Sequence, residues 1–240
     1  MFDFKSVGVE LKSRLSSYVP LPDIRGAGHV LRAGDGVVHL NGLHGCRLGE
    51  LIEFEEGGYA IVMNLEEEEV GAVLLGSDAE VSVGQSAYGT GQVLSVPVGD
   101  TLLGRVVNPL GQVMDGGKRL HPVGYEPIEA PAPSILDRSP VDSPMETGLI
   151  SVDSMVPIGR GQRELIIGDR QTGKTSIAID TILNQKGKNV TCFYVAIGQK
   201  ASSVAQILDT LRKAGAMDYT CVVCSTASDS ATLQYIAPYC

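Results

Sequence analysis

The chain has 240 residues, of which 43% are hydrophobic and 20% are charged, and its formal net charge at pH 7 is −9. This composition is typical of a globular protein with enough chain for two cores, and it excludes intrinsic disorder. The negative charge argues against a nucleic-acid partner, because phosphate backbones require clustered lysine and arginine. No apolar stretch approaches the ~20 residues of a membrane-spanning helix. The first residues have no basic region followed by an apolar run, so we expect a cytoplasmic protein.

Residues 1–25 form the first of three regions. Within it, residues 5–18 place apolar side chains at spacings of four and three, which predicts a short amphipathic helix that ends before Pro20. Two interpretations stay open for this helix. It is either a docking arm or an irregular first helix of the core.

Residues 26–93 form the second region, where short β-like runs alternate with glycine. Examples are 36–40, 50–54, 59–63 and 71–75. Because turn signals recur about every ten residues, this texture predicts a small all-β barrel or sandwich.

Residues 94–240 form the third region, which opens with a proline-rich connector and continues as alternating strands and helices. The expected strands are 164–167, 190–197 and 220–224, and the expected helices are 174–184, 203–214 and a third one capped by Ser228 or Asp229. This order predicts an α/β domain with a parallel sheet and helices on its faces.

Cys221 and Cys224 have the C-x-x-C spacing that is typical of redox and zinc sites. They lie, however, in an apolar run that predicts a buried strand. Positions three apart on a strand point to opposite faces of the sheet. We therefore interpret both as core residues.

A phosphate-binding loop is the clearest functional signal. Residues 168–175, GDRQTGKT, match G-x-x-x-x-G-K-[ST] completely, after a predicted strand and before a predicted helix. Glycines allow the loop to turn its N–H groups inward, and the helix N-terminus adds partial positive charge where phosphates bind. Lys174 supplies a full charge for the β and γ phosphates. The Thr175 hydroxyl is suited to Mg²⁺, which keeps most of its waters.

The amino-acid sequence of this loop and of several other runs is similar to that of the α subunits of F-type ATP synthases. The matching runs are 159–175, 194–200, 233–239, 49–54, 97–100, 103–108 and 157–160. They occur in the family's order and cover essentially the entire chain. Among the departures, Gln92 stands where many members have Arg, and Glu146 where many have Gln.

The resemblance implies a β-barrel of six strands and a RecA-like nucleotide domain. It also implies that α and β subunits alternate in a ring around the central-stalk γ subunit, that the N-terminal helix contacts the peripheral-stalk δ subunit, and that a proton gradient drives the complex. The expected location is the cytoplasmic face of a bacterial cell membrane, with peripheral attachment through the complex.

The resemblance further implies ATP or ADP with Mg²⁺ as the ligands and Thr175 as the metal ligand. The implied nucleotide contacts are Gly168, Asp169, Arg170, Gln171, Thr172, Gly173, Lys174, Thr175, Ser176 and Gln199. Gln199 is an amide where the related β subunit has a catalytic glutamate. The expected role is therefore regulatory and non-catalytic, because an amide cannot accept a proton.

Two alternatives remain. A stand-alone RecA-like motor, such as a Rho-type helicase or a flagellar export ATPase, shares the fold. A non-functional fragment is the other, because the chain ends at Cys240 while family members continue. For the same reason we expect the nucleotide domain to be incomplete at its C-terminal end.

Overall fold

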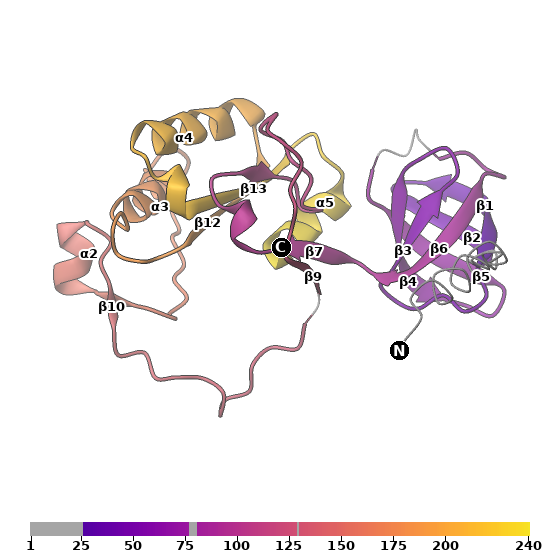
Figure 1. Ribbon diagram of the computed structural model, residues 1–240, viewed down its shortest axis with the longest axis horizontal. Coiled ribbons are helices and arrows are strands. Elements are labelled where there is room, and N and C mark those ends of the chain that lie inside the picture. The colour runs from indigo at the N-terminus through magenta and orange to yellow at the C-terminus, as the bar shows by residue number, and fades with distance from the viewer. Residues whose placement is uncertain (1–25, 77–80, 129) are drawn as a thin grey trace, which may run out of the picture.

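The computed structural model describes residues 26–76, 81–128 and 130–240, which form a barrel and an α/β part (Figure 1). The barrel lies on one side, and the chain leaves it through β6 (Ser86–Val93) to enter the second part at β7 (Ser95–Val98). The predicted helix 5–18 and the arm 1–25 lie outside the described residues. Within the described residues, no helix has the length and apolarity needed to span a bilayer.

The barrel is closed by six strands in the order β1-β2-β5-β4-β3-β6. The remaining strands are β1 (Ala27–Gly34), β2 (Val37–Gly42), β3 (Glu50–Phe54), β4 (Tyr59–Leu65) and β5 (Glu69–Leu74). Buried and partly exposed side chains alternate along β3 and β5, so one face of each strand lines the core. The β-barrel expected from the glycine-punctuated runs is confirmed.

The second part is built on a parallel sheet with the strand order β12-β13-β8. Its strands are β12 (Cys192–Gln199), β13 (Thr220–Thr226) and the short β8 (Val106–Val107). The parallel sheet is confirmed. β8 comes from the segment that the sequence suggested was only a connector, and it joins the sheet by pairing Val106 with Val222.

Helices cover one face of this sheet (Figure 1). α3 (Lys174–Leu183) and α4 (Ala201–Lys213) share a buried apolar cluster with β12 and β13. The smaller elements are η2 (Asp100–Leu102), β9 (Gly124–Pro127), β10 (Pro144–Met145), α2 (Ile150–Met155), β11 (Ile158–Gly159), η3 (Met217–Tyr219), α5 (Ala231–Ile236) and η4 (Ala237–Tyr239). β9 pairs with β7, and β10 pairs with β11.

Cys221 and Cys224 lie on opposite faces of β13, as their spacing predicts. Cys224 belongs to the cluster under α3 and α4, whereas Cys221 packs with Val107 and Val223 on the other face. Burial raises the pKa of the Cys221 thiol to about 11, so it stays protonated at neutral pH. Both residues are core thiols.

The prediction of a strand at 164–167 is wrong. The segment has no assigned secondary structure and pairs with none of the described strands, and its apolar side chains are open: Leu165 is 82% and Ile167 84% exposed. A strand requires a neighbour that accepts and donates its ladder hydrogen bonds. An apolar run predicts burial, but it cannot say whether that neighbour is present.

The predicted cap of the third helix is also corrected. α5 begins after Ser230, whose hydroxyl accepts a hydrogen bond from the Leu233 N–H at 3.3 Å. Asp229 instead accepts from the N–H of Thr226 and closes the turn after β13. All of these residue types are good caps, so composition alone could not choose among neighbours.

α5 also joins the two parts of the molecule. Its Ile236 belongs to one buried apolar cluster with Ile61 and Leu75 of the barrel side and Leu94 of the crossing segment. The barrel and the α/β part therefore share a small apolar joint.

Candidate nucleotide-binding site

The phosphate loop runs from Gly168 into the first turn of α3 with the backbone that its glycines make possible. Gly173, at the N-cap, has φ +93, a left-handed conformation that favours glycine. At Gly168, an added Cβ would lie 2.9 Å from the Thr172 hydroxyl oxygen, so the loop closes against this glycine. Gln171 also has a positive φ, +62, which is uncommon for a residue with a side chain. The loop is therefore tight and locally strained.

Lys174 is turned back over the loop. Its Nζ donates to the carbonyl oxygens of Gly168 and Asp169, and Thr172 Oγ1 donates to the same Asp169 carbonyl at 2.9 Å. Within the described residues, Lys174 makes no ion pair with a carboxylate. Its positive charge is held at the loop by neutral partners.

A cavity of about 850 Å³ lies beside the loop, between α3, α4 and the end of β12. Thr175 and Ser176 line it from the first turn of α3, and Gln199 lines it from the end of β12. Arg170 and Lys200 add two cations at its wall. Two helices thus begin at this cavity, which favours negatively charged ligands.

Gln199 is set in place by the end of β12. Its side-chain Nε2 lies 3.2 Å from the Tyr194 hydroxyl and donates to it, and its backbone carbonyl accepts from the Ala227 N–H at 3.1 Å. The pairing with β13 shifts between Ile197 and Gln199, which turns the strand end at this point. The amide oxygen remains as the acceptor available to a ligand.

The structure thus brings Gln199 to the same cavity as Arg170, Thr175 and Ser176, although 23 residues separate Thr175 from Gln199 in the numbering. The other expected contacts, Gly168, Asp169, Gln171, Thr172, Gly173 and Lys174, form the loop itself and do not line this cavity. α3 and α4 share a buried apolar cluster with β12, and α4 begins directly after β12, which explains the meeting.

Sequence reasoning did not assign several further lining residues to the site. Among them are Asp180 of α3, and Lys200 and Ser203 at the start of α4. Lys200 directly follows Gln199, so its position was available from the motif. Asp180 carried no signal, because an acidic residue on a helix is most often solvated.

Comparison with known proteins agrees with this geometry. The sequence family described as the ATP synthase alpha/beta family, nucleotide-binding domain, matches residues 148–240, and that family's beta-barrel domain matches residues 24–91. The ATP synthase subunit alpha of Acetivibrio thermocellus is 54% identical over 98% of this chain and 46% of the relative. That of Caldanaerobacter subterraneus subsp. tengcongensis is 58% identical over 88% of this chain and 42% of the relative.

The chain spans less than half the length of these curated relatives. The two family matches nevertheless cover both the barrel and the α/β part, and they occur in the order of the fold. The chain therefore belongs to the ATP synthase alpha/beta family and is similar, within that family, to the alpha subunits.

Proposed function

We propose that this chain is the nucleotide-binding part of a regulatory, non-catalytic α subunit of a proton-translocating F-type ATP synthase, which makes ATP from ADP and phosphate. The observation that carries the proposal is the cavity where Thr175, Ser176 and Gln199 meet beside a complete phosphate loop. The printed names of the relatives support the assignment to an ATP synthase α subunit.

The loop fits the phosphates of ATP or ADP. The left-handed Gly173 and the close approach at Gly168 form a backbone cradle that larger side chains would fill. Lys174 brings a charge that no described carboxylate neutralises. A polyphosphate replaces the loop carbonyls as the partner of Lys174, which exchanges neutral hydrogen bonds for charge-assisted ones.

The donor set also fits Mg²⁺ that is held mainly by phosphates and water. No group of three or more His, Cys, Asp or Glu side chains among the described residues could hold a metal alone. Thr175 offers one hydroxyl oxygen, and Gln199 an amide oxygen, at the same cavity. Such a sparse set is the usual pattern for Mg²⁺ bound together with a nucleotide.

Hydrolysis lacks a suitable base at this site. Gln199 occupies the place at the strand end, but an amide cannot take a proton from water. Asp180 is the carboxylate of the cavity wall, and it lies five residues beyond Thr175 on α3. At ~1.5 Å per residue the Cα atoms of Thr175 and Asp180 are roughly 7.5 Å apart along the helix axis, so Asp180 is set back from the first turn of α3.

The assembly follows from the same proposal. The partners are β subunits in an alternating ring, the central-stalk γ subunit and the peripheral-stalk δ subunit, with attachment to the cytoplasmic face of the bacterial membrane through the complex. The division into an arm 1–25, a barrel 26–93 and a nucleotide domain 94–240 belongs to this proposal. A stand-alone motor gains no support from the relatives, whose names are those of ATP synthase subunits.

Titration of the 240-residue chain with MgATP and MgADP tests the proposal. Lys174→Ala is expected to weaken binding by at least ~100-fold, because the loop loses its charge. Lys213→Ala is the matched control, since Lys213 pairs with Asp209 on the surface of α4 and does not line the cavity. Unchanged affinity in Lys174→Ala would refute the site, and no binding by the parent chain would favour the non-functional fragment.

A further assay tests the non-catalytic role. ATP turnover is measured in assembled complexes that contain full-length versions of this subunit and β subunits disabled at their own glutamate. We expect turnover at background. Turnover that is lost on Lys174→Ala in this subunit would show that the site is catalytic.

A further inference from the structure

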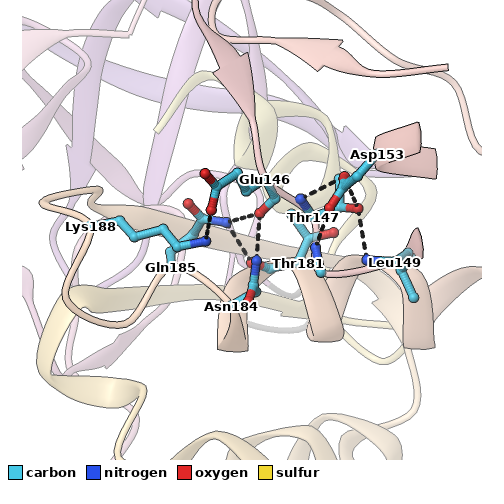
Figure 2. A network of polar contacts seen from close by, with 9 residues as sticks. Glu146, Thr147, Leu149, Asp153, Thr181, Asn184, Gln185 and Lys188 are labelled. Carbon is cyan, nitrogen blue, oxygen red and sulfur yellow. Dashed lines mark hydrogen bonds and ion pairs between the residues drawn. The ribbon is translucent and has the colours of Figure 1, made fainter. Parts of the chain in front are cut away.

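A polar network, in which Thr147 and Gln185 are buried, holds the far end of α3 (Figure 2). It joins Glu146 and the residues that follow it, ahead of the phosphate loop, to the residues just after α3. We call it the clasp, and it consists of Glu146, Thr147, Gly148 and Asp153 on one side and Asn184, Gln185 and Lys188 on the other.

The centre of the clasp is the backbone carbonyl of Glu146. It accepts hydrogen bonds from Asn184 Nδ2 and Gln185 Nε2, each at 2.8 Å. Gln185 is only 3% exposed, and its second amide hydrogen goes to the Thr181 carbonyl at 3.0 Å. Both donors of a buried amide are thus used, and one of them crosses between two segments of the chain.

The other side of the clasp is fixed by Asp153 of α2. Its carboxylate accepts from the Thr147 hydroxyl at 2.6 Å, from the Thr147 N–H at 3.0 Å and from the Gly148 N–H at 2.9 Å. These hydrogen bonds lower the pKa of Asp153, and the one from the Thr147 hydroxyl contributes most. The turn before α2 is therefore a rigid support for the Glu146 carbonyl.

Close packing completes the contact at Gly148. This residue has φ +81, and an added Cβ would lie 2.9 Å from Asn184 Cγ. Only a glycine gives both the left-handed backbone and the space for Asn184. A methyl group here would push the end of α3 away from its support.

The clasp bears on the phosphate loop because α3 connects the two. The ten residues of α3 span roughly 15 Å, with the loop at one end and the clasp at the other. The segment 164–167 before the loop pairs with no described strand, so it does not fix the loop from its other side. The direction of α3 depends on its buried residues, Ile179 and Ile182, and on the clasp.

We infer that Asn184, Gln185 and Gly148 are positioning residues for the nucleotide site, which they hold in register with Gln199 through α3. The inference rests on the proposed function, since it concerns the same site. The phosphate loop lies between Glu146 and Gln185 in the sequence, and the hydrogen bond from Gln185 Nε2 to the Glu146 carbonyl brings the two ends of this segment together. The clasp closes this segment, so it acts on the loop without touching the nucleotide.

Two variants of the 240-residue chain loosen the clasp by different means. Gln185→Leu keeps a side chain of similar size and removes the donors, and Gly148→Ala displaces Asn184. We expect each to raise the Kd for MgATP by about three- to thirty-fold, the usual range for coupling through an intermediate element. We also expect faster hydrogen exchange at amides 168–176 of the ligand-free chain, measured under conditions in which circular dichroism shows each variant to be folded.

Two control variants test for a merely structural effect. Thr181→Val removes the hydrogen bond from Thr181 Oγ1 to the Ile177 carbonyl (2.8 Å) and leaves the carbonyl that Gln185 uses. Glu146→Gln removes the ion pair with Lys188 and keeps the backbone carbonyl at the centre. Both are expected to change the Kd by less than about twofold, because surface pairs and single helix hydrogen bonds act locally.

The readouts separate the two hypotheses. Lys174→Ala is expected to weaken binding by at least ~100-fold and to leave exchange at the clasp unchanged, so it reports on the proposed function alone. If the parent chain binds no nucleotide, exchange at 168–176 still decides the clasp. Folded Gln185→Leu and Gly148→Ala variants that keep the parent exchange rates at 168–176 would overturn the inference. If only one of them folds, that variant decides.

Discussion

A short apolar run forms a strand in the barrel, whereas a similar run in the α/β part does not. In the barrel, the run Glu50–Phe54 becomes β3, because β4 and β6 pair with it on both sides. In the α/β part, the run 164–167 is at least as apolar, yet it stays outside the sheet with Leu165 and Ile167 exposed. A short apolar run therefore specifies a strand only together with its neighbours.

Closure is the physical difference. A closed barrel has no edge, so each of its six strands finds both neighbours within one short stretch of chain. The parallel sheet β12-β13-β8 has two edges and takes β8 from a segment more than a hundred residues before β13. The strands of the parallel sheet therefore depend on distant parts of the chain for their partners, whereas the strands of the barrel do not.

The largest expected difference concerns local opening. We expect amides of β2 and β5, which pair with each other within the closed ladder, to exchange at least ~10³-fold more slowly than amides 164–167. Native-state hydrogen exchange on the same sample measures both regions at once. Similar protection in 164–167 would mean that this run finds a strand partner in solution.

The next difference is in side-chain burial, tested by the same substitution in both regions. Leu40 of β2 is fully buried in the barrel, and Leu165 is 82% exposed. Leu40→Ala is expected to lower the free energy of unfolding of the barrel by about 2–5 kcal/mol. Leu165→Ala is expected to change it by less than about 0.5 kcal/mol.

Urea unfolding followed by far-ultraviolet circular dichroism measures this pair, with separate transitions for the two parts. A cost for Leu165→Ala above about 1.5 kcal/mol would contradict the exposure of this segment. It would also show that Leu165, like Leu40, is buried in the folded protein.

Local signals predicted most of the fold and much of the site. Glycine spacing and alternation indicated the barrel, and the G-x-x-x-x-G-K-[ST] pattern placed the loop and Lys174 at the start of α3. What failed depended on distant partners or on a choice between equivalent neighbours. β8 needed β13 as its partner, and Ser230 competed as a cap with Ser228 and Asp229, which are equally good cap residues. The clasp carried no motif at all, because it is made through a backbone carbonyl.

An acid-sensitive contact distinguishes the α/β part further. Asp115 lies against Arg105 with two charge-assisted hydrogen bonds, of 2.8 and 2.9 Å, and also accepts from the Val106 N–H of β8 at 3.1 Å. The Arg105 guanidinium holds the pKa of the Asp115 carboxyl well below its usual range. Because the folded-state pKa is lowered, the stabilisation is fully present above the ordinary aspartate value near 4 and is lost progressively as pH falls from there towards the lowered folded-state pKa.

Asp115→Asn is therefore expected to cost about 1.5–3 kcal/mol at pH 7, and less as the pH falls below 4. Unfolding of the α/β part at pH 7, 4 and 2.5 measures this loss, with the barrel transition as the internal reference. A cost that stays constant down to pH 2.5 would exclude the ionised carboxylate as its source.

The smallest expected effect concerns α5, the helix that joins the two regions. Ser230→Ala removes the hydroxyl that accepts from the Leu233 N–H, and the loss of such a cap costs about 1 kcal/mol. Ser228→Ala is the matched control, because Ser228 Oγ lies 2.8 Å from the Thr226 hydroxyl and caps no helix. Fraying at the cap is expected to speed exchange of amides 231–236. The barrel strands are expected to stay unchanged, because their ladder is closed and only an apolar cluster that includes Ile61 and Ile236 connects them to α5. Equal effects of the two serine substitutions on these amides would show that the turn after β13, and not the Ser230 cap, holds the joint together.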